Sequence, residues 1–568
     1  MEITYIKIIN YRNLNGLEVN INQDINFIVG ENNIGKSNFQ NCLLKILSGK
    51  AFQKEDFTDE SQRIVVEMTF HLNEEEIGIF DDLVDPMNRE MINIISIQEN
   101  PDEYIKYYHK ETGETIPSSL IKRVNIISYD SLRNPKNEID FGKTKGAGAF
   151  LNFIVRKYIT DYMGGGILKK SEVKKAEKYI SNSLGNLVAF NRFGIKPKVD
   201  ADDAEILSRV LLLKDSNDID IPENGYGVQF NLLIMLSLLE KIIEFRKKAQ
   251  AVETEFSALL VFDEPEIHLH PYLQRTLIKD IYRLATGQDE QFNNLLEEYF
   301  GITKISAQII ITTHSPNILG DDYSKIIRMY KTADYTAAVS CANMILDVRE
   351  KKQLLMQFEY IKEAIFARAA IIVEGESEFG SFKLFAETLG VDFDKDGIAL
   401  IKAGGADSIL PIIKLFNKLA IKAVGVIDND KKIEKNLPDE EYLFYTKSKC
   451  FDSEIVKRVI HNKRYDILET ILTEFDSQGR NRCIQQQKLK DTIQTFSYKR
   501  VNADKSYKFM DVDITNTLYE VMYVSWFSIC KGILLGKTIG ENLDKKNIPI
   551  CYINAIKKVK EYADESYR

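Results

Sequence analysis

The sequence has little cysteine: six residues in 568, and no two of them form a C-x-x-C pair. This spacing predicts neither a disulfide framework nor a zinc ribbon, and it fits a reducing cytoplasm. The chain also lacks an apolar run long enough to span a membrane, and its amino terminus lacks the pattern of a signal peptide. We therefore expect a cytoplasmic protein without a membrane partner.

Repeats, low-complexity tracts, long heptad arms and proline- or glycine-rich linkers are absent too. Domain boundaries must therefore be inferred from changes in the hydrophobic pattern. The net charge of −9 excludes a uniformly basic nucleic-acid coat, although a local basic face is compatible with it. With 44% hydrophobic and 28% charged residues the composition is that of a globular protein, and the length suggests about three or four domains.

What is present is a phosphate-binding loop. Residues 30–37 read Gly-Glu-Asn-Asn-Ile-Gly-Lys-Ser and match G-x-x-x-x-G-K-[ST], between the apolar run 25–29 and the helix-like segment 38–47. In such a loop, backbone N–H groups and the helix N-terminus surround phosphate oxygens, the lysine reaches the β/γ-phosphates and the serine hydroxyl holds Mg²⁺. A simple strand-to-helix turn is the alternative. The residues that we expect to contact ATP here are Gly30, Asn33, Gly35, Lys36 and Ser37.

Two later segments have the pattern of buried parallel strands that end in polar residues. Residues 257–262 run into Asp263 and Glu264, and residues 308–313 run into His314. Asp263 suits the Mg²⁺ shell, and Glu264 suits the polarisation of the attacking water. Because open α/β sheets bind ligands at the carboxyl ends of their strands, we expect these residues beside the phosphate loop.

A second glycine-containing helix start lies upstream of these two acids. Gly225, Gly227 and Gln229 precede an apolar helix expected over residues 230–243. Such a start forms another phosphate cradle, and one chain cannot easily use two cradles on one nucleotide. A homodimer that sandwiches two ATP molecules can do so, with each cradle facing the phosphate loop of the other subunit.

In this order the motifs resemble those of the ABC-type ATPase heads of the SMC, RecF and OLD (overcoming lysogenisation defect) proteins, over about residues 1–330. The resemblance implies a signature segment at 225–229, Walker B acids at positions 263 and 264, and a switch histidine at position 314. It therefore implies an ATPase that works as a dimer of heads.

Two other features of this half have competing interpretations. Gln98 follows a strand-like segment and is a candidate for the Q-loop glutamine, but an ordinary surface glutamine is the expected interpretation. His268 and His270 form an H-x-H pair that can chelate a metal, although their segment resembles the dimer-contacting D-loop of the ABC-type heads. We therefore expect no metal site at these histidines.

The carboxyl-terminal half has an acidic pattern of its own. Glu374 follows the strand-like run 369–373, and Asp428 and Asp430 follow the run 423–427. Parallel strands would bring these carboxylates together, where their repulsion is costly without a cation. Ligand sets made only of oxygen select Mg²⁺ or Mn²⁺, and two such ions can activate water and stabilise the leaving oxygen of a phosphodiester.

These acids resemble the Toprim fold of topoisomerases, primases and OLD nucleases. The resemblance implies that Glu374, Asp428 and Asp430 hold catalytic metal ions. It also implies that Glu378, one helical turn after the first acid, is the second acid of the OLD pattern V-E-G-x-x-E.

Further residues match the later part of the OLD pattern. Asp452 and Glu454 resemble an acidic strand end that completes the metal sites, with both side chains facing one cation; a helix start at this point is the equal alternative. OLD nucleases also use a lysine near the C-terminus to neutralise transition-state charge. Lys537 is the preferred candidate for this role and Lys531 the alternative.

An ABC-type head followed by a Toprim domain is the architecture of the OLD family, and the predicted fold class is α/β. We expect the head in residues 1–144 and 197–345, interrupted at 145–196 by a helical insertion that serves dimerisation. Residues 346–568 are expected to form the Toprim nuclease domain with a mostly helical C-terminal part.

The resemblance implies a homodimer or higher homo-oligomer that binds and hydrolyses ATP and cuts DNA with Mg²⁺ or Mn²⁺, as an antiphage defence effector. A defence-system partner would be a helicase or a reverse transcriptase–msDNA complex. The alternative is a RecF- or SMC-like DNA-repair ATPase clamp with a non-catalytic Toprim module. A topoisomerase would need an attacking tyrosine in a separate domain, which is not apparent, and a primase would need the zinc ribbon that the cysteine spacing excludes.

Overall fold

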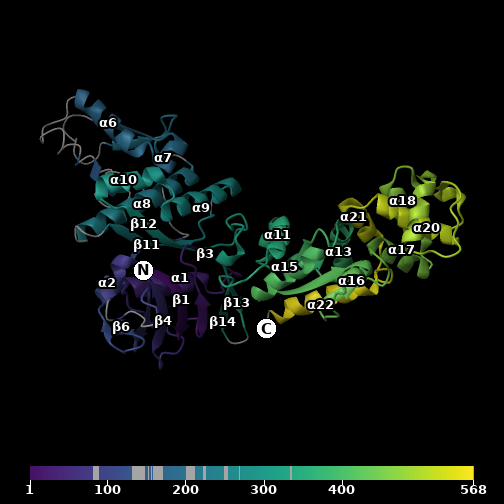
Figure 1. Cartoon of the computed structure of the whole chain (residues 1–568), viewed down its shortest axis with the longest axis horizontal. Helices are drawn as coiled ribbons and strands as arrows, with labels where there is room; N and C mark the ends of the chain where they lie inside the picture. The colour runs from purple at the N-terminus through teal and green to yellow at the C-terminus, as the bar shows by residue number, and fades with distance from the viewer. Residues whose placement is uncertain are drawn as a thin grey trace. The chain divides into compact units, whose positions relative to one another are not determined.

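The computed structural model of the chain divides into two compact units (Figure 1). It describes residues 1–80, 83, 88–130, 148–150, 153–154, 157, 170–199, 211–221, 225–248, 254–267, 269–332 and 335–566. Residues 1–330 and 334–342 form the first unit, and residues 331–333 and 343–568 form the second. The division falls close to the boundary expected between residues 345 and 346.

A mostly parallel sheet carries the first unit. Strands β8, β11, β12, β3 and β13 are parallel, and β14 completes the sheet at one edge. Their apolar runs are buried because helices and a second sheet cover both faces. The strands predicted before the phosphate loop, the two acids and the histidine are confirmed as β3, β11 and β12. The order across the sheet is β14 (Thr336–Ser340), β13 (Ile326–Lys331), β3 (Ile25–Val29), β12 (Lys304–Thr312), β11 (Glu255–Asp263) and β8 (Asn125–Tyr129).

An antiparallel sheet packs beside it. Burial alternates along its longest strands, as expected for a sheet with only one face in the core. Helix α1 (Lys36–Ser48) contributes to the core between the sheets. The order is β2 (Leu17–Asn20), β1 (Glu2–Ile9), β4 (Ile64–His71), β5 (Met91–Gln98), β6 (Lys106–His109) and β7 (Thr115–Ile116).

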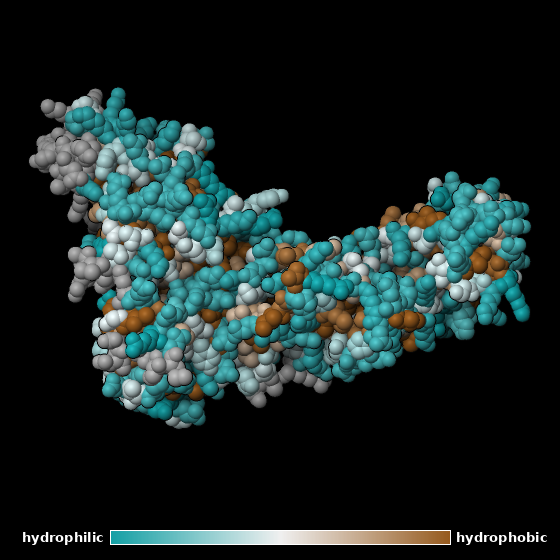
Figure 2. Space-filling model, in the orientation of Figure 1, coloured by the Kyte–Doolittle hydropathy of each residue, from teal (hydrophilic) through white to brown (hydrophobic). Residues whose placement is uncertain are grey.

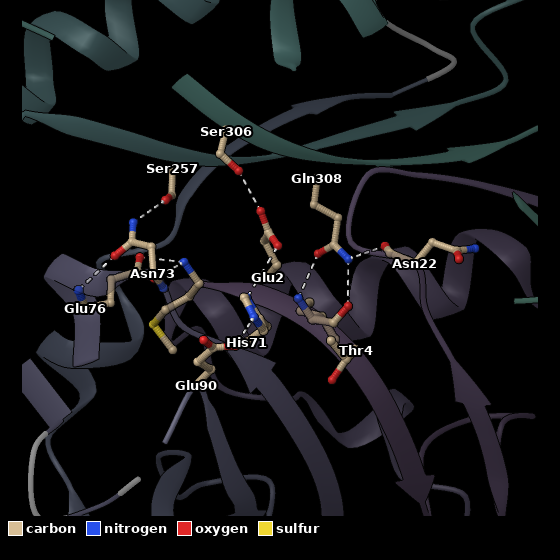
Figure 3. Close-up of polar contacts among 12 residues, drawn as sticks. Glu2, Thr4, Asn22, His71, Asn73, Glu76, Glu90, Ser257, Ser306 and Gln308 are labelled. Atoms are coloured by element: carbon tan, nitrogen blue, oxygen red, sulfur yellow. Dashed lines mark hydrogen bonds and ion pairs between the residues drawn. The ribbon is translucent and has the colours of Figure 1, made fainter. Parts of the chain in front are cut away.

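Buried polar contacts tie the two sheets together (Figure 3). The Gln308 amide on β12 donates to the carbonyls of Ile3 (2.6 Å) and Asn22 (2.7 Å), and its oxygen accepts from the Ile3 N–H (2.9 Å). Ser306 donates to Glu2 at 2.6 Å. Because Ile3 lies where the pairing of β1 with β4 is irregular, Gln308 satisfies backbone groups that the ladder leaves open. These contacts fix β1 against the parallel sheet.

Helices cover the parallel sheet of the first unit. They are α8 (Tyr226–Lys248), α9 (Pro271–Ala285) and α10 (Glu290–Phe300), joined by α6 (Lys170–Leu184), α7 (Val188–Phe193) and the ribbon of β9 (Lys196–Val199) with β10 (Leu211–Lys214). Helices α6 and α7 lie in the stretch predicted as a helical insertion. Residues 149–158 of the same stretch have the spacing of a helix in the sequence, and half of them lie outside the described residues.

A four-stranded parallel sheet forms the centre of the second unit. Its order is β16 (Ile398–Lys402), β15 (Ala369–Val373), β17 (Lys422–Ile427) and β18 (Leu443–Tyr445). The helices that pack against these strands include α13 (Glu376–Thr388), α15 (Ala406–Lys418) and α22 (Ile550–Glu565). Strands β15 and β17 confirm the strand-like runs predicted at 369–373 and 423–427.

The rest of the second unit is mostly helical, as expected. The charged segment 349–368 has the sequence pattern of one helix, but the structure forms two, α11 (Val348–Met356) and α12 (Phe358–Ala364), because the chain leaves helical geometry at Gln357. The remaining helices include α16 (Asn429–Lys435), α17 (Phe451–His461), α18 (Tyr465–Phe475), α19 (Gln486–Thr495), α20 (Thr517–Ile529) and α21 (Ile533–Asn542).

The visible surface is mostly hydrophilic, with scattered apolar side chains (Figure 2). Among the second unit's large apolar side chains, Ile345, Val348, Ile433 and Leu534 are the most exposed. No helix in the described ranges is both long and apolar enough to cross a membrane.

Candidate nucleotide and metal sites

The phosphate loop connects β3 to α1 in a strained, closely packed conformation. Gly30, Asn33 and Gly35 all have positive φ angles, of 153°, 61° and 109°. A Cβ at Gly30 would lie 2.4 Å from the Met329 carbonyl of β13. Asn13 donates to the Ile34 carbonyl at 2.9 Å. The loop shape is therefore set by its neighbours as well as by its own glycines.

Lys36 is held inside this loop. Its side chain is 5% exposed, and Nζ donates to the carbonyls of Gly30 (3.1 Å) and Glu31 (2.8 Å). Burial lowers the pKa of Lys36 to about 8, against the opposing effect of Glu264 and Asp263. The ammonium is thus poorly solvated and placed where a phosphate would stabilise its charged form.

Ser37 and Asp263 meet at the carboxyl edge of the sheet. The Ser37 hydroxyl donates to both carboxylate oxygens of Asp263, at 3.1 and 3.2 Å. Thr312, at the end of β12, also donates to Asp263, and Gln40 on α1 donates to the Phe262 carbonyl at 2.8 Å. The structure therefore brings together the hydroxyl and carboxylate predicted for the Mg²⁺ shell.

Glu264 and His314 lie next to this pair. Glu264 has a φ of 49°, and its N–H donates to the Thr312 carbonyl at 3.0 Å. Its Oε1 lies 3.4 Å from Nε2 of His314. Burial, and secondly Lys36, lowers the pKa of His314, so the imidazole is neutral at pH 7. A strained non-glycine residue at a strand end is typical of a functional site.

Glu266 is a residue of this site that sequence reasoning did not assign. One carboxylate oxygen accepts from the His314 N–H (2.7 Å) and from the Thr313 hydroxyl (2.8 Å). Burial raises its pKa. Glu266 therefore fixes the end of β12 that carries the histidine. In the sequence, Glu266 could have been found as the third acid of the segment Asp-Glu-Pro-Glu, two residues after Glu264.

The proposed signature residues lie at the start of α8. Gly225 directly precedes the helix, and Gln229 is buried at 5% exposure. A Cβ at Gly227 would lie 2.8 Å from Leu273 Cδ1 of α9. That atom is the end of a flexible side chain, so α9 packs closely against this position without by itself requiring glycine.

Gln98 and His270 make structural contacts in this chain. Gln98 is 1% exposed; it accepts from the Phe52 N–H at 2.7 Å and donates to the Phe52 carbonyl at 2.9 Å. The expectation of a surface glutamine is therefore wrong, because the buried amide binds both backbone groups of Phe52. His270 caps the N-terminus of α9, and His268 lies outside the described residues.

In the second unit, Glu374 and Asp428 end the adjacent strands β15 and β17. The Asp428 N–H donates to Glu374 Oε2 at 3.2 Å. Glu378 lies in the first turn of α13 at 6% exposure, and Asp430 lies in the first turn of α16. The parallel pairing of β15 with β17 gathers these acids as predicted.

Electrostatic strain marks this cluster. Burial raises the pKa of Glu378 to about 7, with Asp452 and Glu374 adding to it. Burial also raises the pKa of Asp428, with Glu378 and Glu374 next in effect. Burial raises the pKa of Asp452 to about 6, against the effect of Lys531. Carboxylates that destabilise one another's charge in this way favour binding of a cation.

The donor set fits a hard divalent cation. Asp430 Oδ1 and Asp452 Oδ1 are buried and have no hydrogen-bond partner. Among the described residues, no three carboxylate, histidine or cysteine side chains are already arranged as a complete metal site. The acids are thus gathered and partly unpartnered, and carboxylate oxygens are the ligands that Mg²⁺ and Mn²⁺ prefer.

Comparisons with known families agree with both sites. Residues 167–319 match the model of an AAA ATPase domain. Residues 365–430 match the Overcoming lysogenization defect protein-like TOPRIM domain, and this range contains Glu374, Glu378, Asp428 and Asp430.

Two relatives are similar to this chain over longer stretches. The OLD nuclease of Thermus scotoductus is 26% identical over 288 residues, which are 48% of this chain and 50% of that protein. Endonuclease GajA of Bacillus cereus strain VD045 is 24% identical over 485 residues, 77% of this chain and 76% of the relative. The chain thus resembles these nucleases, and its two matched models are an AAA ATPase domain and an OLD-like TOPRIM domain.

Among solved structures, one similar chain is an Smc head bound to the C-terminal winged-helix domain of ScpA. It is 14% identical, covers 60% of this chain and 98% of its own, and has a TM-score of 0.36.

Within the OLD pattern, the later acids differ from expectation. Asp452 and Glu454 lie in the first turn of α17, not at a strand end. Asp452 lies 3.7 Å from Lys531, whereas Glu454 accepts from the Ser448 N–H. Helix positions i and i+2 point to different sides, so the prediction that both face one cation is wrong. Asp452 acts electrostatically on Glu378 and so lies near the acid cluster.

The choice between Lys531 and Lys537 as the lysine that neutralises transition-state charge also changes. Burial works against charging Lys531, but Asp452 and the other acids raise its pKa above the usual value. Lys537 instead is 60% exposed and lies 3.7 Å from Glu541, one turn along α21. The preference for Lys537 is therefore not supported, because the chain before α21, and not its exposed face, reaches the acids.

Proposed function

We propose that this protein is an ATP-regulated, divalent-metal-dependent DNA endonuclease that acts as a homodimer in antiphage defence. The observation that carries the proposal is the buried acid cluster around Glu374 and Asp428, with Lys531 beside it. Two relatives named as nucleases support it. Because the chain spans only half of the first relative's length, activity and substrate remain proposals.

In this proposal Glu374, Glu378, Asp428, Asp430 and Asp452 hold the metal ions. The ions, when bound, activate water and stabilise the leaving oxygen of the phosphodiester. Lys531 places a positive charge at the same edge and neutralises charge that develops on the phosphate in the transition state. Burial of the acids excludes bulk water, which strengthens each of these interactions.

The head would bind ATP through Lys36, with Mg²⁺ held by Ser37 and Asp263. Glu264 would polarise the attacking water, and His314, kept neutral, would contact the same water or the γ-phosphate. In a homodimer the segment 225–229 of one subunit would complete the site of the other. Nucleotide occupancy would then control access of DNA to the acid cluster.

A DNA cleavage assay tests the whole proposal. Purified protein is incubated with supercoiled and linear DNA, with Mg²⁺ or Mn²⁺, with and without ATP. We expect cleavage that needs the metal and responds to ATP. Intact DNA in every metal condition, alongside persistent ATP hydrolysis, would favour the alternative of an ATPase clamp with a non-catalytic Toprim module.

The two lysines give a direct comparison. We expect Lys531→Ala to lower the cleavage rate by roughly 10²- to 10³-fold, because it removes a charge aimed at the transition state. Lys537→Ala should cleave at the wild-type rate and is the matched control. Single-turnover rates measure both variants; the reverse ranking would restore Lys537 as the lysine of the site.

Glu264 can be separated from ATP binding. Glu264→Gln keeps the size of the side chain but cannot polarise water, so ATP hydrolysis should slow by roughly 10²-fold or more. Binding of ATP should stay within a few-fold of wild type. Phosphate release and nucleotide titration measure the two quantities, and unchanged turnover would show that another residue activates the water.

A further inference from the structure

Helices α13 and α21 approach each other backbone to backbone (Figure 1). A Cβ added at Gly380 on α13 would lie 2.2 Å from the Ile533 carbonyl oxygen, and one added at Gly536 on α21 would lie 2.0 Å from the Ser377 carbonyl oxygen. Both distances are below 3.0 Å, which Cβ atoms essentially never reach. Only glycine at these two positions permits the observed separation of the helices.

This contact lies at the acid cluster. The first turn of α13 carries Glu378, and Lys531 stands two residues before α21. The Gly532 N–H donates to the Ser377 hydroxyl at 3.2 Å, so the segment that carries the lysine is anchored to the same turn. Lys531 Nζ then lies 3.7 Å from Asp452. The spacing of the two helices therefore sets where the ammonium lies relative to the carboxylates.

We propose that Gly380 and Gly536 are positioning residues of the nuclease centre, which act by holding Lys531 against the acids. The inference rests on the proposed nuclease function and on the role of Lys531 in it. A methyl group at either glycine would push α21 away from α13 by about 1 Å, and a displacement of that size costs on the order of 10²-fold in rate. The metal-binding acids lie on other strands and helices and would stay in place, apart from Glu378.

The test is a double-mutant cycle. Gly380→Ala and Gly536→Ala should each lower the cleavage rate by roughly 10²-fold, with ATP hydrolysis unchanged. Combining Gly536→Ala with Lys531→Ala should be no slower than Lys531→Ala alone, because both changes act through one side chain. A merely structural defect would instead lower the double variant further, in proportion to the fraction misfolded.

Two further variants keep the result interpretable. Gly78→Ala is the matched control, since an added Cβ at this glycine of α2 (Glu74–Phe80) meets no atom within 4 Å. Ser377→Ala removes only the hydrogen bond that anchors Gly532, and it is used if the glycine variants do not fold. It should lower the cleavage rate roughly 10-fold. Combined with Lys531→Ala, it should lower the rate no further than Lys531→Ala alone.

Different outcomes would contradict the positioning role of the glycines and the proposed nuclease function. Wild-type cleavage by the glycine variants, or additive losses in the cycle, would overturn the positioning role and leave the nuclease proposal intact. Unchanged cleavage by Lys531→Ala would overturn the role of the lysine and the inference with it. Absence of cleavage by the wild-type protein in every metal condition would overturn the proposed function itself.

Discussion

Asp428→Asn should reduce metal-dependent DNA cleavage by on the order of 10³-fold while leaving ATP hydrolysis unchanged. Asp428 is buried at the end of β17, where its backbone N–H binds Glu374 and its carboxylate interacts with Glu378. The amide keeps the size of the side chain but removes the negative charge that a divalent ion needs. Rates on supercoiled DNA measure cleavage, and phosphate release measures ATP hydrolysis by the head.

The same substitution should stabilise the metal-free second unit. Burial and the neighbouring acids raise the pKa of Asp428, so its charged form destabilises the folded state at neutral pH. Removing that charge should raise the melting temperature by about 2–4 °C for each kcal/mol relieved. The gain should shrink as the pH falls below the raised pKa, because the wild-type carboxyl is then neutral as well. Calorimetry across pH measures the difference.

Metal titrations complete this prediction. Mg²⁺ or Mn²⁺ should raise the melting temperature of the wild-type protein and have little effect on Asp428→Asn. Asp394→Asn is the control, since Asp394 is exposed and pairs with Lys383 on the same unit. Undiminished cutting by Asp428→Asn would end the assignment of the metal site.

Lys36→Ala should weaken ATP binding by roughly 10- to 100-fold, the effect of losing charge-assisted hydrogen bonds. The lysine is buried in the phosphate loop, where its ammonium donates to the Gly30 carbonyl and a bound phosphate would pair with its charge. Lys50→Ala, at an exposed position just after α1, is the control. Equilibrium nucleotide titration measures both, and wild-type affinity in Lys36→Ala would contradict the nucleotide site.

The pH dependence of binding gives a second measurement. Burial lowers the pKa of Lys36 to about 8, and phosphate favours its charged form, so ATP binding should take up a proton. Affinity should therefore be full below about pH 8 and fall as the pH rises through this value. The fall should be absent from Lys36→Ala.

Much of the chemistry was readable from local sequence. The phosphate loop, the acids at 263 and 264 and the histidine at 314 each follow an apolar run that forms a strand of one parallel sheet. Strands of this kind place their carboxyl ends at one edge, so residues far apart in the chain meet there. The same reasoning placed Glu374 beside Asp428 in the second unit.

Other site residues could be assigned only once the positions of the helices were known. The choice between Lys531 and Lys537 depends on where α21 begins, and the separation of Asp452 from Glu454 depends on their lying in a helix. Gln98 and Glu266 were misjudged or missed because their partners, Phe52 and His314, are distant in sequence. No periodic pattern marks such pairs.

By itself the sequence determined two strand–helix sheets, a nucleotide loop and a set of acids, since each is a short motif with a fixed local geometry. Only the tertiary structure decided which lysine reaches the acids and that glycines at 380 and 536 allow it, because the contact joins Ser377 to Gly532, 155 residues apart in the chain, and depends on how the helices pack.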